Sequence, residues 1–170
     1  MEATVVQPGN DIRRRTMKRA VAVAAMAGAM TLGQMTSATA ATGAQTFSIV
    51  GVNDRQTVIA TGLVRGVGTV TPIDDESDLL SFASGTLRLN RPQTGGDFNL
   101  NPRTCVATAT FTGTYTLTEG AGAYAGASGT GTYSGRGVFR FDRNPDGSCS
   151  EADQVFAAFT ARNTGTTSLP

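Results

Sequence analysis

The sequence TGTYTLTEGAGAYAGASGTGTYSGRG, residues 112–137, decides the fold of this 170-residue chain. Two runs that alternate threonine with tyrosine or glycine flank a segment of small residues, 120–127, with Tyr124 at its centre. Threonine and tyrosine favour strands, and a period of two is typical of a β-strand that buries one face. The stretch therefore predicts two long antiparallel strands joined into a hairpin.

The two faces of this hairpin differ in composition. In residues 105–118 every even position from 108 onward is threonine, whereas Phe111 and Tyr115 stand at odd positions. In residues 129–142 Tyr133 and Phe139 share a face with the glycines. We expect the aromatic face to point inward because burial of aromatic side chains is favourable, so the glycines point inward as well.

The same period of two continues through the rest of the chain from residue 46, and no long stretch has the 3.6-residue period of a helix. Residues 91–103 are expected to form a loop because they contain two prolines and two glycines. About eight strands joined in sequence would leave exposed edges in an open sheet, so we predict an all-β domain, a closed antiparallel β-barrel. The expected strands are 46–52, 57–64, 66–70, 79–90, 105–118, 129–142 and 154–162.

Glycine and alanine on the inner face have a physical consequence. A glycine within a strand costs conformational entropy and contributes no packing, so it is kept where the sheet bends or another group approaches closely. An interior lined by small residues and a few aromatics would not be filled by its own side chains, which predicts a central cavity. The alternative is that the glycines only permit coiling and that the core is packed solid.

Residues 1–40 have the composition of a secretory signal peptide. Five basic residues between 13 and 19 precede an apolar stretch, 20–32, and Ala38 and Ala40 form an Ala-x-Ala cleavage site. The apolar stretch is too short for a membrane span, which needs about 20 residues. We expect cleavage after Ala40, secretion, and a single domain in residues 41–170; an uncleaved anchor or a buried helix is the alternative.

The basic segment begins far from the first residue of the chain. One explanation is that Met17 is the true start. The other is that residues 13–18 form a twin-arginine export signal, although they lack its usual aromatic residue. The missing aromatic favours Met17, and export would then survive deletion of residues 1–16.

Charge and residue types exclude several function classes. Without residues 1–40 the chain keeps nine arginines and eleven acidic residues and has no lysine. A slightly acidic surface does not match a phosphate backbone, so nucleic acid is not an expected partner. No basic amphipathic segment indicates stable membrane association after cleavage. The sequence has no histidine and no G-x-x-x-x-G-K loop, so we expect no metal site and no cofactor.

Cys105 and Cys149 are the two cysteines of the chain. In an oxidising compartment such a pair is expected to form one structural disulfide. Closing a loop of about 45 residues would contribute about 4 kcal/mol in the chain-entropy description. A nucleophilic cysteine is not expected because the chain has no histidine to serve as its base.

Residues 120–135, GAGAYAGASGTGTYSG, resemble the turn-and-strand signature of the allene oxide cyclase and dirigent barrels. In those barrels a glycine-rich hairpin with a central aromatic residue, here Tyr124, joins two long strands. The resemblance, which is nearest to exported bacterial proteins of this type, implies an eight-stranded antiparallel barrel with an apolar cavity, no cofactor, a homo-oligomeric assembly and a turn plugged by Tyr124. Members guide cyclisation or coupling of small hydrophobic molecules, but their catalytic carboxylates match no residue of this sequence one by one.

Tyr115 and Tyr133 are the candidate polar residues of the barrel interior. Each combines an apolar ring with one hydroxyl, which suits a hydrophobic ligand that carries a single oxygen function. The alternative is a core tyrosine whose hydroxyl meets a backbone carbonyl. The expected apolar lining of the ligand site consists of Phe111, Phe139, Leu87 and Phe159.

The acidic residues lie mostly in predicted turns, where we expect them to be solvated. The densest group is 74–78, in which Asp74, Glu76 and Asp78 alternate as calcium ligands sometimes do. The glycine and the distal glutamate of an EF-hand loop are missing, so calcium is the less favoured interpretation. No carboxylate pair is expected inside the barrel.

Three functions remain from the sequence. The protein is a cofactor-free cyclase, isomerase or stereo-directing protein that holds a folded substrate in a shaped cavity. Alternatively, it is a secreted carrier of hydrophobic small molecules without chemistry. The third possibility is a structural surface barrel with a filled core, which would retain no ligand.

Overall fold

A computed structural model describes residues 40–170; residues 1–39 of the predicted signal peptide, with both candidate start sites, lie outside the described residues. The described part contains nine antiparallel strands and no helix. They are β1 (Ala41–Val52), β2 (Arg55–Thr61), β3 (Gly66–Pro72), β4 (Ser77–Phe82), β5 (Gly85–Asn90), β6 (Gln93–Asn101), β7 (Val106–Gly122), β8 (Ser128–Arg143) and β9 (Cys149–Leu169).

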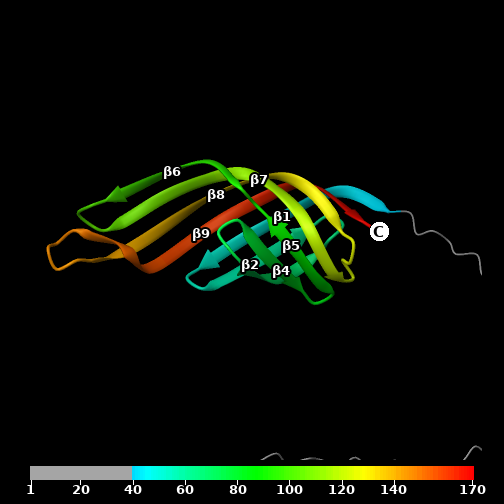
Figure 1. Cartoon of the computed structure of the whole chain (residues 1–170), viewed down its shortest axis with the longest axis horizontal. Helices are drawn as coiled ribbons and strands as arrows, with labels where there is room; N and C mark the ends of the chain where they lie inside the picture. The colour runs from blue at the N-terminus through cyan, green and yellow to red at the C-terminus, as the bar shows by residue number, and fades with distance from the viewer. Residues whose placement is uncertain (1–39) are drawn as a thin grey trace, which may run out of the picture. The chain divides into compact units, whose positions relative to one another are not determined.

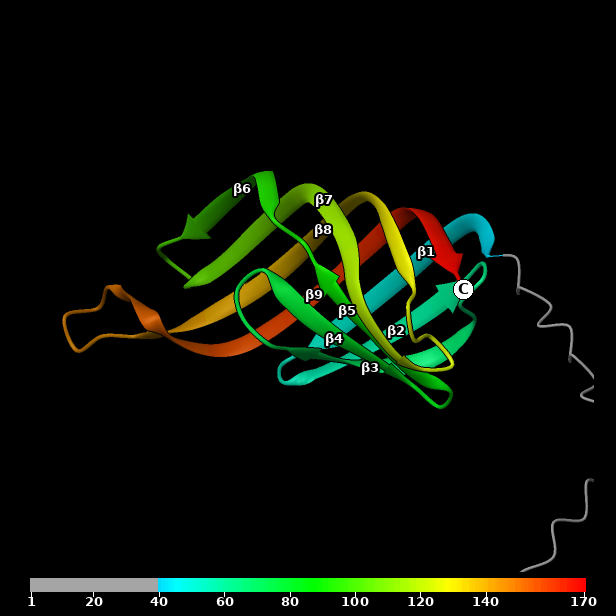
Figure 2. The same ribbon diagram turned by 45° about the vertical axis from the view of Figure 1, so that its right-hand side comes forward.

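Eight of these strands close into a barrel, as the sequence predicts. The hydrogen-bonded order runs from β5 through β4, β3, β2, β1, β9 and β8 to β7, and β5 pairs in turn with β7 (Figures 1 and 2). Closure leaves none of these eight strands as a free edge along its whole length, which satisfies the backbone groups of a small all-β domain.

Strand β7 pairs with two different strands along the same edge. Its second half pairs with β5, from Asn90↔Thr116 to Gly85↔Gly122, and its first half pairs with β6, from Asn101↔Val106 to Gln93↔Gly113. Figure 2 shows β6 running beside β7 away from the closed barrel. We use the name extension for this part of the sheet. It consists of β6 and of the adjoining parts of β7, β8 and β9, residues 106–113, 133–143 and 149–157.

Several elements differ from the sequence-based expectation. The last strand runs from Cys149 to Leu169 and not only over 154–162, and the first begins at Ala41 and not at residue 46. Residues 79–90 form not one strand but the hairpin β4–β5, in which Phe82 pairs with Gly85. Residues 91–103 are not a loop, because β6 occupies most of them. The register of β6 shifts between Gln93 and Gly95, and its side chains are mostly exposed, so its sequence lacks the alternation that marks a buried strand.

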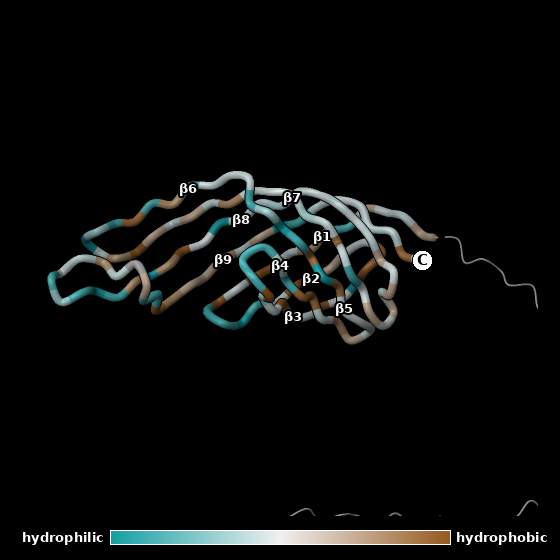
Figure 3. Tube along the Cα trace, in the orientation of Figure 1, coloured by the Kyte–Doolittle hydropathy of each residue, from teal (hydrophilic) through white to brown (hydrophobic). Residues whose placement is uncertain are grey.

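The inward and outward faces of β7 and β8 agree with the predicted alternation. All six threonines at even positions of 108–118 are exposed, whereas Tyr115 and Tyr133 are buried. Figure 3 shows hydrophilic residues at the β6–β7 and β8–β9 turns. The buried face thus follows directly from the period of two.

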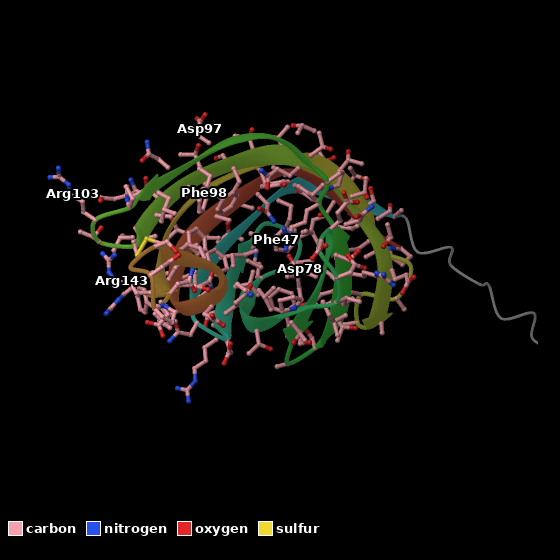
Figure 4. All side chains as sticks on the ribbon, turned by 60° about the vertical axis from the view of Figure 1, so that its left-hand side comes forward. Phe47, Asp78, Asp97, Phe98, Arg103 and Arg143 are labelled. Atoms are coloured by element: carbon pink, nitrogen blue, oxygen red, sulfur yellow. A yellow bond between two sulfur atoms is a disulfide. The ribbon has the colours of Figure 1, made fainter. Side chains whose placement is uncertain are left out.

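The closed end of the barrel is packed solid. Its fully buried side chains include Phe47, Leu80, Leu87, Leu89 and Tyr115, and the rings of Phe47 and Tyr115 meet edge to face at 6.3 Å. Figure 4 shows Phe47 inside the ring of strands. Tyr124 lies in the β7–β8 turn, where its hydroxyl is 2.6 Å from that of Ser84 and its ring packs against Phe82.

The inward glycines do not line a hollow here, because aromatic rings occupy their positions. Gly131 lies directly opposite Tyr115 in the β7–β8 pair, and a Cβ at residue 131 would overlap with the tyrosine ring. Gly135 and Phe111 make the same kind of pair. Each ring lies across the bare backbone of its neighbour, so glycine provides room for a large side chain next to it.

Cys105 and Cys149 form the predicted disulfide, with their Cα atoms 5.4 Å apart. The bond joins the residue before β7 to the first residue of β9, at the tip of the extension. In Figure 4 the sulfur atoms lie near Arg143, whose guanidinium bonds to the carbonyls of Gly147 and Arg103 across the same tip. The disulfide therefore fixes the two turns of the extension to each other.

Candidate functional site

A cavity of about 250 Å³ remains at the open end of the barrel, between the packed core and the extension, and residues of both line it. Residues of seven strands line it, together with Arg91 from the link between β5 and β6; β3 and β5 contribute none. Its apolar lining is Ile49, Phe111, Phe139, Phe159 and Ala161. Its polar lining is Gln56, Asp78, Arg91, Gln93, Tyr133 and Asn163.

Alternation along β9 brings three of these residues into one row. Phe159, Ala161 and Asn163 are two residues apart, so their side chains share the inner face. Asn163 pairs with Phe47 of β1 on one side and with Tyr133 of β8 on the other, which places it where the cavity meets the packed core. Strand β9 thus contributes both apolar and polar residues to the cavity lining.

An ion pair with a buried carboxylate forms part of the cavity wall. The side chain of Asp78, in β4, is 3% exposed and accepts hydrogen bonds from Nε and Nη2 of Arg91, the second at 3.2 Å. Arg91 lies between β5 and β6, and its backbone N–H donates to the carbonyl of Glu76 at 2.6 Å. The hydrogen bond with Asp78 raises the pKa of Arg91, so the wall carries a fixed pair of opposite charges.

Tyr133 is tied to the same wall. Its hydroxyl donates a hydrogen bond of 3.2 Å to the backbone carbonyl of Arg91. Burial raises the pKa of Tyr133, and the nearby Arg91 charge opposes part of that rise. At neutral pH the side chain is a neutral phenol at the edge of the cavity.

Three buried polar atoms have no hydrogen-bond partner within residues 40–170: Tyr115 Oη, Asn163 Nδ2 and Thr167 Oγ1. Tyr115 and Thr167 lie in the packed core, and burial raises the pKa of Tyr115. Asn163 is 1% exposed and, unlike the other two, lines the cavity. Buried polar groups are nearly always paired, so these three atoms are exceptions among the described residues.

A shallower hollow of about 340 Å³ continues from the cavity along the extension. It shares Gln93, Phe111 and Phe139 with the cavity and adds Phe98 and Phe141, whose rings meet at 6.2 Å. Phe98 is 60% exposed, and Figure 4 shows it on the inner side of the sheet, opposite to Asp97. A row of phenylalanines therefore leads from the extension into the barrel.

Four of the six residues proposed from the sequence as ligand-binding lie together in this cavity: Phe111, Tyr133, Phe139 and Phe159. The other two, Tyr115 and Leu87, belong to the packed core below it. Tyr133 also fits the alternative interpretation, because its hydroxyl meets a backbone carbonyl.

Sequence reasoning missed Asp78, Arg91 and Asn163. The expectation that the acidic residues of 74–78 are solvated is wrong for Asp78, which is buried because strand β4 begins at Ser77 and turns this side chain inward. Alternation from Leu80 backward would have placed Asp78 on the buried face. For Asn163 the signal was its position four residues after Phe159.

The alternating acids of 74–78 do not converge on a common point. Asp74 is exposed and its carboxylate accepts a hydrogen bond from the N–H of Glu76, which lowers its pKa, whereas Asp78 is committed to Arg91. Within the described part of the chain no three His, Cys, Asp or Glu side chains are grouped as metal ligands.

Comparison with models of known families, with characterised proteins and with solved structures found no match to this chain. Residues 40–170 contain no helix that is long and apolar enough to cross a membrane.

Proposed function

We propose that this protein binds a hydrophobic small molecule in the cavity at the open end of its barrel. The observation that carries the proposal is the composition of the cavity, which combines three phenylalanines with the Asp78–Arg91 ion pair, the phenol of Tyr133 and the amide of Asn163. Small-molecule sites are typically concave and mostly apolar, with a few fixed polar groups that orient the ligand.

The size of the site supports a ligand of modest dimensions. The cavity of about 250 Å³ is close to the lower end of the usual range for ligand pockets, about 300 Å³, and the hollow along the extension enlarges it. Because side chains fill the packed core, we expect the ligand to bind at the open end of the barrel and not to occupy the whole interior.

A second candidate function is cofactor-free cyclisation, isomerisation or stereo-direction at the same site. The Asp78–Arg91 pair would present a fixed electric field to a bound molecule, and Tyr133 would present a hydroxyl. Holding a substrate in one folded conformation is itself a source of acceleration. The allene-oxide-cyclase-like hairpin around Tyr124 and the eight-stranded barrel support this candidate.

Binding can be tested with N-phenyl-1-naphthylamine, a neutral dye that fluoresces in apolar surroundings. The chain contains no tryptophan, so the background emission is low. We expect saturable enhancement with the wild-type protein and its loss in Ala161→Phe, which fills the cavity. The control is Thr160→Phe, on the exposed outer face of the same strand. Equal enhancement by the two variants, or none by the wild type, would reject the cavity as the site.

Native mass spectrometry of the purified protein then distinguishes a ligand-binding barrel from a structural one. A retained small molecule supports the binding proposal and supplies the substrate for an activity assay. In that assay Tyr133→Phe should bind the molecule but convert it more slowly if the protein is an enzyme. Unchanged conversion would remove Tyr133 from the chemistry, and absence of any conversion would favour a carrier.

We place this function outside the cytoplasm. The basic and apolar segments of residues 13–32 and the disulfide between Cys105 and Cys149 support export. The N-terminal sequence of the protein recovered from the medium is expected to begin at Ala41. Recovery of the uncleaved chain from the cell interior would contradict this.

A further inference from the structure

The apolar residues of the cavity come from one side of the barrel, and four of its polar residues come from the other. The closed ring of strands runs through β4, β3, β2, β1, β9, β8 and β7, and β6 pairs with β7 on the same edge as β5. Strands β1, β9, β8 and β7 supply all of the apolar lining. The remaining part of the ring supplies only polar residues, which we call the polar side of the cavity: Gln56, Asp78, Arg91 and Gln93.

The two polar lining residues outside the polar side offer no free donor to a ligand. The Nδ2 atom of Asn163 has almost no accessible surface, and the hydroxyl of Tyr133 already donates to the backbone carbonyl of Arg91. Hydrogen bonds to a ligand acceptor are therefore expected from the polar side.

The exposed part of the Asp78–Arg91 ion pair is its cation. The side chain of Asp78 is 3% exposed, whereas that of Arg91 is 31% exposed. Nε and Nη2 of Arg91 donate to the carboxylate, and Nη1 makes no hydrogen bond within residues 40–170. Nη1 is at the corner of the planar guanidinium away from this carboxylate, so both of its hydrogens remain available to an acceptor in the cavity.

The side-chain amides of Gln56 and Gln93 also have no hydrogen-bond partner in the described part of the chain. Gln56 is partly buried and Gln93 is exposed, so water competes with a ligand for the second amide in particular. A hydrogen bond from a charged donor is roughly twice as strong as one from a neutral amide. Arg91 is therefore expected to dominate the polar contacts of a ligand, and the two glutamines to contribute less.

From these observations we infer that the ligand is a hydrophobic molecule with a carbonyl oxygen on one edge, and that this oxygen accepts a hydrogen bond from Nη1 of Arg91. The inference rests on the proposed binding function and specifies its ligand class. The apolar part of the ligand lies against Phe111, Phe139 and Phe159, which belong to the other side of the barrel.

Two planar naphthalenes of nearly equal shape test the ligand class. 2-Acetylnaphthalene has a carbonyl oxygen, and 2-isopropenylnaphthalene has a methylene group in its place. Each compound is titrated into the full barrel loaded with N-phenyl-1-naphthylamine, and its affinity is obtained from the displacement of this dye. We expect the ketone to bind roughly tenfold more tightly than the alkene, the effect of one hydrogen bond to a charged donor.

Variants assign the preference to Arg91. In the double variant Asp78→Leu, Arg91→Leu, which leaves no unpaired charge, the dye should still bind and the ketone and the alkene should bind with equal affinity. Gln56→Leu and Gln93→Leu should each reduce the preference by at most about twofold, because their amides are neutral. The control is Arg88→Leu, which removes an arginine with exposed ion pairs outside the cavity and should leave the preference intact.

The guanidinium NMR signals of Arg91 give the same assignment in the wild-type protein. They should shift when the ketone is added and stay in place with the alkene. A ketone that shifts only the side-chain amide signals of the glutamines would overturn the role of Arg91.

The outcomes separate this inference from the proposed function. Equal displacement of the dye by ketone and alkene, or none by either, would overturn the ligand class and leave a hydrophobic binding site. A preference that survives in the double variant, or that disappears in either glutamine variant alone, would overturn the role of Arg91. Failure of the dye itself to bind the wild type would overturn the binding function and the inference together.

Discussion

At the scale of single residues, the ion pair of Asp78 and Arg91 concentrates charge in an otherwise apolar interior. Asp78 is nearly inaccessible, whereas Arg91 is about one-third exposed, so the guanidinium keeps part of its hydration and the carboxylate depends on the guanidinium. Such pairs contribute little relative to a well-packed apolar replacement, but removing one partner leaves a buried charge without compensation. The pair is therefore expected to fix the geometry of the cavity wall.

Replacing Arg91 with leucine should lower the free energy of unfolding by about 3 kcal/mol, because the carboxylate of Asp78 loses both hydrogen bonds in a buried position. The measurement is urea denaturation at neutral pH. The matched control is Arg88→Leu, because Arg88 makes only exposed ion pairs at 3.8 Å with Asp74 and Glu119, and its loss should cost less than about 1 kcal/mol.

The double variant Asp78→Leu, Arg91→Leu completes the test of this ion pair. It should be markedly more stable than Arg91→Leu alone, since no unpaired charge remains. If the single and double variants were equally unstable, the loss would come from packing of the arginine side chain and not from the uncompensated carboxylate.

Two tyrosines predict the behaviour of the protein at alkaline pH. Burial raises the pKa of Tyr115 and Tyr133 above their ordinary value of 10.0. The folded state then holds these protons more tightly than the unfolded state, so their contribution to stability is complete below pH 10 and is lost as the pH rises through the folded pKa values. Unfolding experiments between pH 9 and pH 11.5 should show a declining free energy.

The variant Tyr115→Phe should weaken that alkaline decline. For each protein, the free energy of unfolding at each pH is compared with its own value at pH 8. Absorbance at 295 nm should show part of the tyrosine titration displaced above pH 10. A decline of equal slope in Tyr115→Phe and the wild type would mean that this hydroxyl ionises at its ordinary pKa.

At the scale of the strands, the recurring device is a glycine directly opposite an inward aromatic residue. Gly51 of β1 pairs with Phe159 of β9, and the atoms that a Cβ at residue 51 would overlap all belong to the Phe159 ring. Glycine costs strand stability through its backbone entropy, but here the ring covers its backbone and excludes water. Sequence alternation alone does not distinguish this use of glycine from one that keeps space open.

Gly51→Ala should therefore destabilise the barrel by about 1–3 kcal/mol, the usual cost of overpacking a core. In a Phe159→Ala background the same change should be neutral or slightly stabilising, because the overlapping ring is gone and alanine is the better strand residue. The four proteins of this double-mutant cycle are compared by thermal and urea unfolding. A cost of Gly51→Ala that is independent of Phe159 would contradict the packing role.

The sequence allowed prediction of those elements in which one face is buried along the whole length. The hairpin β7–β8, the orientation of Phe111 and Tyr133, and barrel closure follow from a period of two and from the need to cover edges. Strand β6 could not be predicted, because it is an edge strand with exposed side chains and a glycine at positive φ, Gly96. Its sequence has the features of a loop.

The same reasoning explains why the polar residues of the candidate site were not predicted from the sequence. Aromatic lining residues such as Phe139 and Phe159 stand in alternating strands and are visible as such. Asp78 and Arg91 lie thirteen residues apart, and only the β4–β5 hairpin and the bend before β6 bring them together. Pairing of charges across a hairpin depends on the turn position, and the prediction of one strand over 79–90 contains no turn.

At the scale of the whole barrel, the disulfide lies at the tip of the extension, outside the cluster of buried apolar residues. The extension beyond the closed barrel has exposed side chains on β6 and at the start of β9, and its two turns are held by Cys105–Cys149 and by the hydrogen bonds of Arg143. Regions with little apolar burial open at a lower free energy than the core. The disulfide is therefore expected to stabilise the folded tip locally, in addition to constraining the unfolded chain.

Reduction of this disulfide should lower the free energy of unfolding by about 4 kcal/mol, the loop-closure value for its separation of 44 residues. Hydrogen exchange should speed up first at residues 99–104 and 141–150, while amides next to Phe47 and Leu87 stay protected until global unfolding, because their packing does not involve the tip. Cys105→Ala, Cys149→Ala without reductant should behave like the reduced wild type, and reductant should not change this variant further. Exchange that accelerates uniformly from tip to core would show that the extension and the closed barrel open as one cooperative unit.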